Sequence, residues 1–173
     1  RRARPSGREN RGLHSRTDNP GIGVAGDDVR ELLKREITPE LYHRILQEWK
    51  THSIAEDRRD IAGLISTLTP DCVYQIVQTG HRWEGHAGAA QFYTQLLGAF
   101  PDIHFDLTNI VVGPQGVCEE ARVTGTFERN WLDFVSTGER VEFRVVIFFP
   151  WDPEREKFRG ERVYFHAGPA FQT

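Results

Sequence analysis

The first part of the chain contains three segments in which apolar residues recur at helical spacing. The best marked segment begins at Thr38-Pro39-Glu40, where a capping hydroxyl, a proline in the first turn and an acidic residue predict a helix start. Its apolar positions follow the helical period: Leu41, Ile45, Leu46, Trp49 and Ile54. A shorter helix is expected over residues 28–36, and a third amphipathic run begins at Ile61 and ends before Pro70. These segments predict a layer of helices.

Alternation of apolar and polar residues, which is typical of strands, dominates the rest of the chain. A strand is expected over residues 72–77, followed by a short return strand through Trp83 and a helix over residues 87–99. Four longer strands are then predicted over residues 103–107, 117–127, 141–149 and 158–166. Consecutive antiparallel strands of this length form a strongly twisted sheet without any parallel pairing. The pattern predicts an α+β fold in which N-terminal helices pack on a strongly curved, mostly antiparallel sheet that encloses a pocket.

The distribution of charge separates a basic arm from an acidic domain. Residues 1–16 contain six arginines and one acidic residue, Glu9, which leaves 16 of the 22 basic and 24 of the 25 acidic residues in the remainder. We expect residues 1–27 to form a disordered arm and residues 28–173 to form a single domain. An acidic domain argues against nucleic acid as a partner, because phosphate binding relies on clustered Lys and Arg. No apolar stretch reaches the ~18 residues of a membrane helix. We therefore expect no membrane partner, and we expect the protein to be cytoplasmic.

Cysteine, histidine and glycine spacings give no indication of a metal or cofactor. Cys72 and Cys118 are the two cysteines, both in predicted strands, and we expect both to be reduced. His81 and His86 are five residues apart, without another His or carboxylate at a recognised metal-ligand spacing. No Gly-rich phosphate motif is present. We therefore expect neither a metal nor a cofactor.

Several short sequence blocks, taken in order, resemble one known family. They are RWEGHAGAAQFY at 82–93, FPDIHFDL at 100–107, GTF at 125–127, TGERVEFR at 137–144 and GERVYFH at 160–166. Their order and spacing resemble the SnoaL-like branch of the nuclear transport factor 2-like superfamily. The resemblance implies a conical α+β fold whose curved sheet wraps a cavity, commonly in a dimer formed through the outer face of the sheet. The superfamily includes polyketide cyclases, epoxide hydrolases, ketosteroid isomerases, dehydratases and proteins that only bind, so the fold leaves the function open.

The catalytic positions known from this family carry apolar residues here. In SnoaL-like cyclases and limonene-type epoxide hydrolases an Asp on the last strand performs acid–base chemistry, and the matching position in this chain is Val163. The hydrolases also carry an Arg and an Asp two residues apart on a middle strand, where the best match is Ala121 and Val123. These apolar side chains cannot transfer protons. The resemblance therefore implies that the chain is not a limonene-type epoxide hydrolase.

The alternation along the strands predicts which side chains line the pocket and which lie outside. The residues expected to line the pocket are Ile76, Trp83, Phe92, Glu119, Ala121, Val123, Phe143, Val145, Val163 and Phe165. The opposite side of the sheet, called the outer sheet face below, is expected to carry Arg122, Thr124, Arg144, Arg162, Tyr164 and His166. Arginine and aromatic residues are enriched at interfaces. The expected partners are a small hydrophobic molecule in the pocket and a second copy of the chain on the outer sheet face.

Three polar residues are the candidates for catalysis: Tyr74, His81 and Glu161. A carboxylate beside apolar surface has a raised pKa and can act as an acid or base, but Glu161 can equally pair with an arginine or lie at a solvated rim. Tyr74 can donate a hydrogen bond to a substrate oxygen or serve only as a half-buried structural residue. His81 lies near the expected mouth of the pocket and titrates near neutral pH. The charged run at residues 56–60 is interpreted as a solvated helix start.

Two functions remain open on this basis. The first is a cofactor-free enzyme that acts on a small hydrophobic carbonyl compound. It would be a cyclase, an isomerase or a dehydratase, and a dehydratase is a lyase. The second is a protein of the same fold that binds a small ligand or assembles with a partner without catalysis. The loss of the last-strand Asp favours the second function, whereas Tyr74, Glu161 and the histidines near the pocket favour the first.

Overall fold

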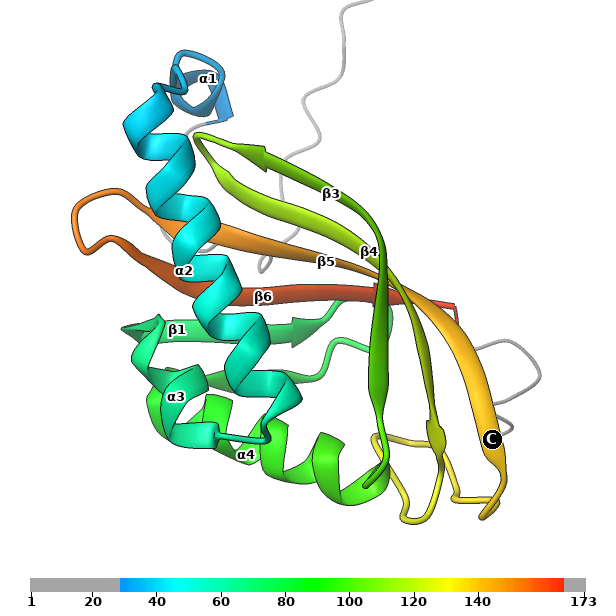
Figure 1. Ribbon diagram of the computed structural model, residues 1–173. Coiled ribbons are helices and arrows are strands. Elements are labelled where there is room, and N and C mark those ends of the chain that lie inside the picture. Colours follow the sequence, from blue (N-terminus) through cyan, green and yellow to red (C-terminus); the bar gives the residue numbers. More distant parts are fainter. Residues whose placement is uncertain (1–28, 167–173) are drawn as a thin grey trace, which may run out of the picture.

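The computed structural model describes residues 29–166, and the basic arm predicted at residues 1–27 lies outside them. Figure 1 shows a curved sheet with helices on one of its sides. In chain order the elements are α1 (Val29–Leu32), α2 (Pro39–Asp57), α3 (Ile61–Ser66), β1 (Leu68–Ile76), β2 (Arg82–Glu84), α4 (Gly85–Ala99), β3 (His104–Gly113), β4 (Gly116–Thr126), β5 (Arg140–Asp152) and β6 (Lys157–Phe165). Helices followed by a curved sheet are the architecture that the sequence predicts.

Helix α2 begins where its sequence predicts. The Thr38 hydroxyl accepts a hydrogen bond from the Leu41 amide at 3.2 Å, and Pro39 occupies the first turn. The helix ends at Arg58 and Arg59, and Arg59 adopts a left-handed conformation with φ of 56° that cannot continue a helix. The charged run at residues 56–60 thus contains the end of α2, which the sequence did not predict, and the start of α3, where the Asp60 carboxylate accepts a hydrogen bond from the Gly63 amide at 2.9 Å.

The sheet contains six strands in the order β2-β1-β6-β5-β4-β3. All neighbouring pairs are antiparallel except β1 and β6, which run parallel, with Tyr74 opposite Glu161 and Ile76 opposite Val163. The prediction that no parallel pairing is needed was wrong. Alternation within a strand indicates which face is buried but carries no information on the direction of a neighbour far away in the sequence.

The predicted alternation of the long strands is confirmed. The inward positions of β4, β5 and β6 are buried, and the six residues of the outer sheet face are exposed or half-buried. One close backbone approach lies in the parallel pair, where Gly160 has φ of +104° and a Cβ built on it would lie 2.0 Å from the Val73 carbonyl oxygen. Only glycine fits at this position.

The helices cover the concave side of the sheet. Figure 1 shows α2 crossing in front of the sheet, with α3 and α4 beside β1. Within residues 29–166, every helix is too short or too polar to cross a membrane. The space between α2, α4 and the long bent strands is where the candidate site lies.

Candidate functional site

A cavity lies between the helices and the sheet, and its free volume is about 20 Å³. Its lining residues are Glu56, Ile76, Phe92, Leu96, Ile103, Phe105, Trp131, Phe143, Val145, Ile147, Glu161, Val163 and Phe165. A volume of this size holds about one water molecule. The cavity is therefore almost filled by its own walls, which are apolar apart from two carboxyl groups and one indole N–H.

Six of the ten predicted pocket residues line this cavity: Ile76, Phe92, Phe143, Val145, Val163 and Phe165. The other four, Trp83, Glu119, Ala121 and Val123, do not line it. Ala121 and Val123 are buried in the core, at 2% and 0% exposure. Their inward direction was predicted correctly, but the twist of β4 carries them past the cavity.

Glu161 lies within a chain of buried hydrogen bonds that fixes the position of a hydrogen on His52. The Thr67 hydroxyl donates its single proton to the Leu64 carbonyl at 2.7 Å, so it must accept in its 2.6 Å contact with His52 Nδ1. The Nδ1 atom of His52 therefore carries a hydrogen. On the other side of the ring, His52 Nε2 lies 3.0 Å from Glu161 Oε1, and the Tyr93 hydroxyl donates to the same oxygen at 2.6 Å. His52 Nε2 also lies 2.9 Å from the Tyr93 hydroxyl, so the imidazole, the phenol and the carboxyl group meet at one point.

Tyr74 extends this chain. Its hydroxyl lies 3.1 Å from the Tyr93 hydroxyl, and since Tyr93 donates to Glu161, Tyr74 donates to Tyr93. Burial and the nearby Glu161 carboxyl raise the pKa of both phenols well above the usual value, so both stay protonated. Two of the predicted catalytic residues, Tyr74 and Glu161, are thus joined through Tyr93. Among residues 29–166 no hydrogen bond reaches the second oxygen of Glu161, Oε2.

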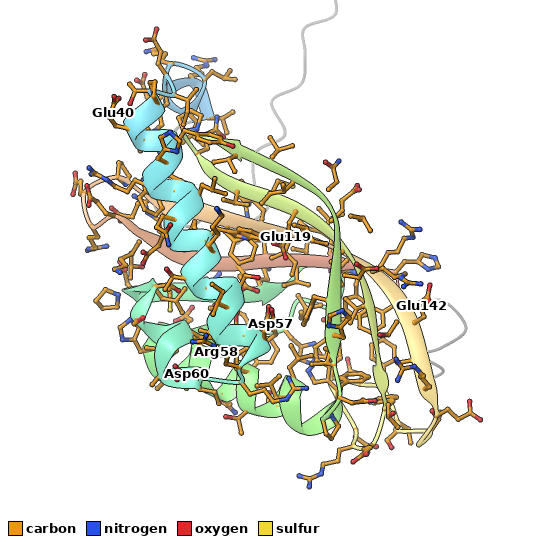
Figure 2. All side chains as sticks on the ribbon, in the orientation of Figure 1. Glu40, Asp57, Arg58, Asp60, Glu119 and Glu142 are labelled. Carbon is orange, nitrogen blue, oxygen red and sulfur yellow. The ribbon has the colours of Figure 1, made fainter. Side chains whose placement is uncertain are left out.

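Glu56 is the second carboxyl group of the cavity, and sequence reasoning assigned it to a solvated run. It lies one turn after His52 on α2 and lines the cavity. Figure 2 shows its neighbours Asp57, Arg58 and Asp60 at this end of α2. Burial raises the pKa of Glu56 well above the usual value, and the charges of Glu161 and Glu119 raise it further. No residue in the described part of the chain forms a hydrogen bond with its carboxyl group.

Glu119 lies outside the cavity and is buried, as Glu161 is, whereas Glu56 is half-buried. Figure 2 shows Glu119 between α2 and the sheet, and Trp49 Nε1 donates to its Oε2 at 2.7 Å. Burial raises the pKa of Glu119 to about 7, against the opposing effect of the Trp49 hydrogen bond. The charge of Glu161 also raises the pKa of Glu119, as it does that of Glu56.

The structure does not bring His81 to this group. Its Nδ1 lies 2.8 Å from the Thr79 hydroxyl, its Nε2 lies 3.8 Å from Asp133, and its ring stacks on Trp83 with a centroid distance of 6.1 Å. These groups border a separate surface cleft of about 390 Å³, called the outer cleft below, which is lined by His81, Arg82, Trp83, Gln95, Asn130, Trp131 and Leu132. Trp131 lines both the outer cleft and the cavity.

Sequence reasoning missed His52, Glu56 and Tyr93 as site residues, and it assigned Trp131 to the core or the pocket wall without a specific role. A signal for two of them was present in α2, because Ile45, Trp49, His52 and Glu56 follow one another at steps of four, three and four residues and share one helix face. Ile45 and His52 are buried, at 0% and 2% exposure. A His and a Glu in such a row indicate polar groups directed at the core. No comparable signal marks Trp131, which lies in a loop.

The model of the SnoaL-like domain matches residues 50–155, more than half of the chain. The chain belongs to the SnoaL-like family. No curated protein matches its sequence. The matched segment begins inside α2 and includes strands β1 to β5, but it ends before β6. The buried Glu161 and the apolar Val163 lie on β6, outside the matched segment.

Solved structures show the same SnoaL-like fold at low sequence identity. A SnoaL-like protein from Jannaschia sp. CCS1, provisionally described as a polyketide cyclase, has a TM-score of 0.62 and 20% identity over 76% of this chain and 90% of its own. AclR from Streptomyces galilaeus, provisionally described as a hydroxylase, has a TM-score of 0.61 and 20% identity over 75% and 93%. An epoxide hydrolase from M. tuberculosis has a TM-score of 0.57 and 19% identity over 75% and 86%. At these identities the likeness establishes the fold alone.

Proposed function

We propose that this SnoaL-like protein is a cofactor-independent cyclase, isomerase or lyase that transfers a proton on a small hydrophobic carbonyl compound, with Glu56 as the base. The observation that carries the proposal is the position of Glu56, a carboxyl group without a hydrogen-bond partner among residues 29–166 that lines an apolar cavity. A base in apolar surroundings has a pKa closer to neutrality and is better matched to removing a proton from carbon.

The chemistry divides between the two carboxyl groups. Ionised Glu56 takes a proton from the carbon next to the carbonyl, and the electron pair of that C–H bond moves to the carbonyl oxygen to give an enolate. In this scheme a proton held between His52 and Glu161, whose side chains meet at 3.0 Å, is the acid that protonates the product at oxygen or at another carbon. Tyr93 and Tyr74 hold Glu161 in place and reach the substrate only through it. Tyr74 is in this scheme a positioning residue.

A second function is supported by two observations. The cavity of about 20 Å³ is far below the several hundred Å³ of typical ligand sites, so a substrate can enter only if wall side chains move. Val163 also occupies the position at which the family's enzymes carry an acidic residue. Both features favour a protein that binds a small ligand or assembles with a partner without catalysis.

Exchange of protons next to a carbonyl group in D₂O, followed by NMR, separates the two functions. We expect the protein to accelerate this exchange for at least one compound in a panel of cyclic ketones and β-keto esters, and Glu56→Gln to reduce the acceleration by about 100-fold or more. The rate should rise with pH as Glu56 loses its proton, and Glu56→Gln should remove this rise. Asp57→Asn, at the exposed neighbouring residue, is the matched control.

Two results would contradict the enzyme. If Glu56→Gln exchanges substrate protons as fast as the unchanged protein, Glu56 is not the base. If no compound in the panel exchanges faster than in buffer while some of them still raise the melting temperature, the protein binds without catalysis.

We also propose that the protein forms a homodimer through the outer sheet face. Tyr164 is 43% exposed there, and the Arg162 guanidinium lies 5.1 Å from the centre of the Phe148 ring on the same face. Figure 2 shows Glu142 on this side of the sheet, where it lies 3.5 Å from Arg122. Aromatic and arginine side chains on a broad sheet surface are typical of protein interfaces.

A further inference from the structure

Trp131 is held in a tight turn between β4 and β5. The amides of Trp131 and Phe134 donate to each other's carbonyl oxygens at 3.2 and 3.0 Å, and Leu132 between them has a left-handed φ of 53°. The indole ring packs edge-on against Phe100 and lies beside Phe165, both at centroid distances of 5.7 Å. The turn therefore fixes the backbone of Trp131, and two aromatic rings fix its side chain.

Trp131 separates two spaces that differ in character. On one side is the cavity, with Glu56 and Glu161, and on the other is the outer cleft of about 390 Å³, where the amides of Gln95 and Asn130 lie. Trp131 lines both. Trp131 is therefore the one residue that the linings of the outer cleft and the cavity have in common.

The indole N–H of Trp131 is a hydrogen-bond donor without an acceptor. The residue is 5% exposed, and its Nε1 atom is buried and has no partner within residues 29–166. An unsatisfied buried donor is unfavourable, and most indole groups at such positions find an acceptor. Trp49 shows the usual arrangement, since its Nε1 donates to Glu119. A donor left open beside a cavity is a site for an acceptor brought by a ligand.

We propose that the Trp131 indole N–H binds the oxygen atom of the ligand, which is a small apolar ketone, ester or alcohol that reaches the cavity from the outer cleft past this ring. The proposal rests on the proposed use of the cavity as the ligand site and names the residue that recognises the ligand. An oxygen held at Trp131 leaves the apolar body of the ligand against Phe143, Phe165 and Val163. A pure hydrocarbon cannot satisfy the donor and should bind less tightly.

Cyclohexanone and cyclohexane, similar in shape but with and without an acceptor, test the proposal in ¹⁵N–¹H NMR titrations of the protein. We expect cyclohexanone to shift the Trp131 indole N–H signal in a saturable manner. Trp151 is an internal control, because its Nε1 is also buried without a partner in the described part of the chain but it does not line the cavity. Its signal should stay in place.

The variant Trp131→Phe keeps an aromatic ring and removes the donor. Loss of one hydrogen bond should weaken cyclohexanone binding by about 5- to 10-fold and leave the affinity for cyclohexane within about twofold. Trp83→Phe, in the outer cleft but not in the cavity, controls for loss of an indole. The proposal would be overturned by any of three results: Trp131→Phe lowers the affinity for both ligands equally, the Trp131 signal does not move, or cyclohexanone shows no saturable binding. These readings need no turnover, so they do not depend on whether Glu56 acts as a base.

Discussion

His52 on α2 and Glu161 on β6 are 109 residues apart in the sequence, and their side chains meet at 3.0 Å with almost no exposure to solvent. The pair joins the helical layer to the sheet at the cavity wall. Because Thr67 fixes the hydrogen on the far side of the imidazole ring, Nε2 is the nitrogen that faces Glu161. The same contact thus contributes both to the fold and to the geometry of the site.

Removing one member of this pair should destabilise the protein more than removing both. His52→Leu leaves Glu161 buried without its partner, and Glu161→Met leaves His52 in the same condition, so each should lower the free energy of unfolding by about 3 kcal/mol or more. The double variant removes both polar groups, so its loss of unfolding free energy should be smaller than the sum of the losses in the two single variants. Urea unfolding of the four proteins measures this difference. Additive losses would show that the pair is not coupled.

Glu119 should make the protein less stable as the pH rises. Its pKa is raised to about 7, so between about pH 4.5 and 7 the folded protein holds a proton that the unfolded chain has lost. The stabilisation from this protonated group is complete below about pH 4.5 and is lost as the pH rises through 7. Glu119→Gln stays uncharged and retains an acceptor for Trp49. The free energy of unfolding of this variant should equal that of the unchanged protein near pH 5 and exceed it by up to about 3 kcal/mol at pH 8.

Chemical unfolding of both proteins across this pH range tests the prediction. Glu120→Gln, at the exposed neighbouring position, controls for the loss of one negative charge. A constant difference between Glu119→Gln and the unchanged protein at every pH would show that Glu119 does not titrate in this range.

A methyl group at Gly160 should prevent β1 from pairing with β6. The added Cβ would lie 2.0 Å from the Val73 carbonyl oxygen, and the φ of +104° is unfavourable for alanine. We expect Gly160→Ala to cost at least about 3 kcal/mol in thermal or urea unfolding. Gly113→Ala is the matched control, because no atom lies within 4 Å of its added Cβ, and it should change stability by no more than about 0.5 kcal/mol. Equal stability of the two variants would contradict the close approach.

A charge on the outer sheet face should separate the proposed dimer. Tyr164→Glu places a carboxylate at an exposed aromatic position of β6, where burial against a second copy would become costly. Light scattering at micromolar concentration should give a dimer for the unchanged protein and a monomer for this variant. Tyr42→Glu, at an exposed tyrosine of α2, should remain dimeric. A monomer in the unchanged protein would contradict the proposed interface.

The fold could be predicted from the sequence to the extent that local patterns determine it. Thr38 and Pro39 mark the start of α2, and the alternation from Val141 to Phe149 gives the correct buried face of β5. The parallel contact of β1 with β6 could not be predicted, because it depends on how distant strands meet. The sequence therefore predicted elements and faces better than it predicted neighbours.

The candidate site was predicted only in part, for a related reason. Glu161 was identified because it alternates with apolar residues on a strand, whereas Glu56 lies in the run 56–60, whose average polarity indicates solvent. The residue that distinguishes Glu56 from that run is His52, one turn earlier on the buried face of α2. Trp131 could not be found by periodicity, because a four-residue turn has no period.

The parallel pairing of β1 with β6 also determines the order in which the protein can be completed during synthesis. Glu161 and the rest of β6 are synthesised after the other five strands, so β1 and β5 are made before the strand that lies between them. Until then the sheet consists of two separate parts with open edges, and His52 has no carboxylate beside it. Contacts between segments so distant in the sequence form slowly. A chain that lacks β6 therefore exposes strand edges that can pair with other chains. Such an incomplete product is expected to aggregate.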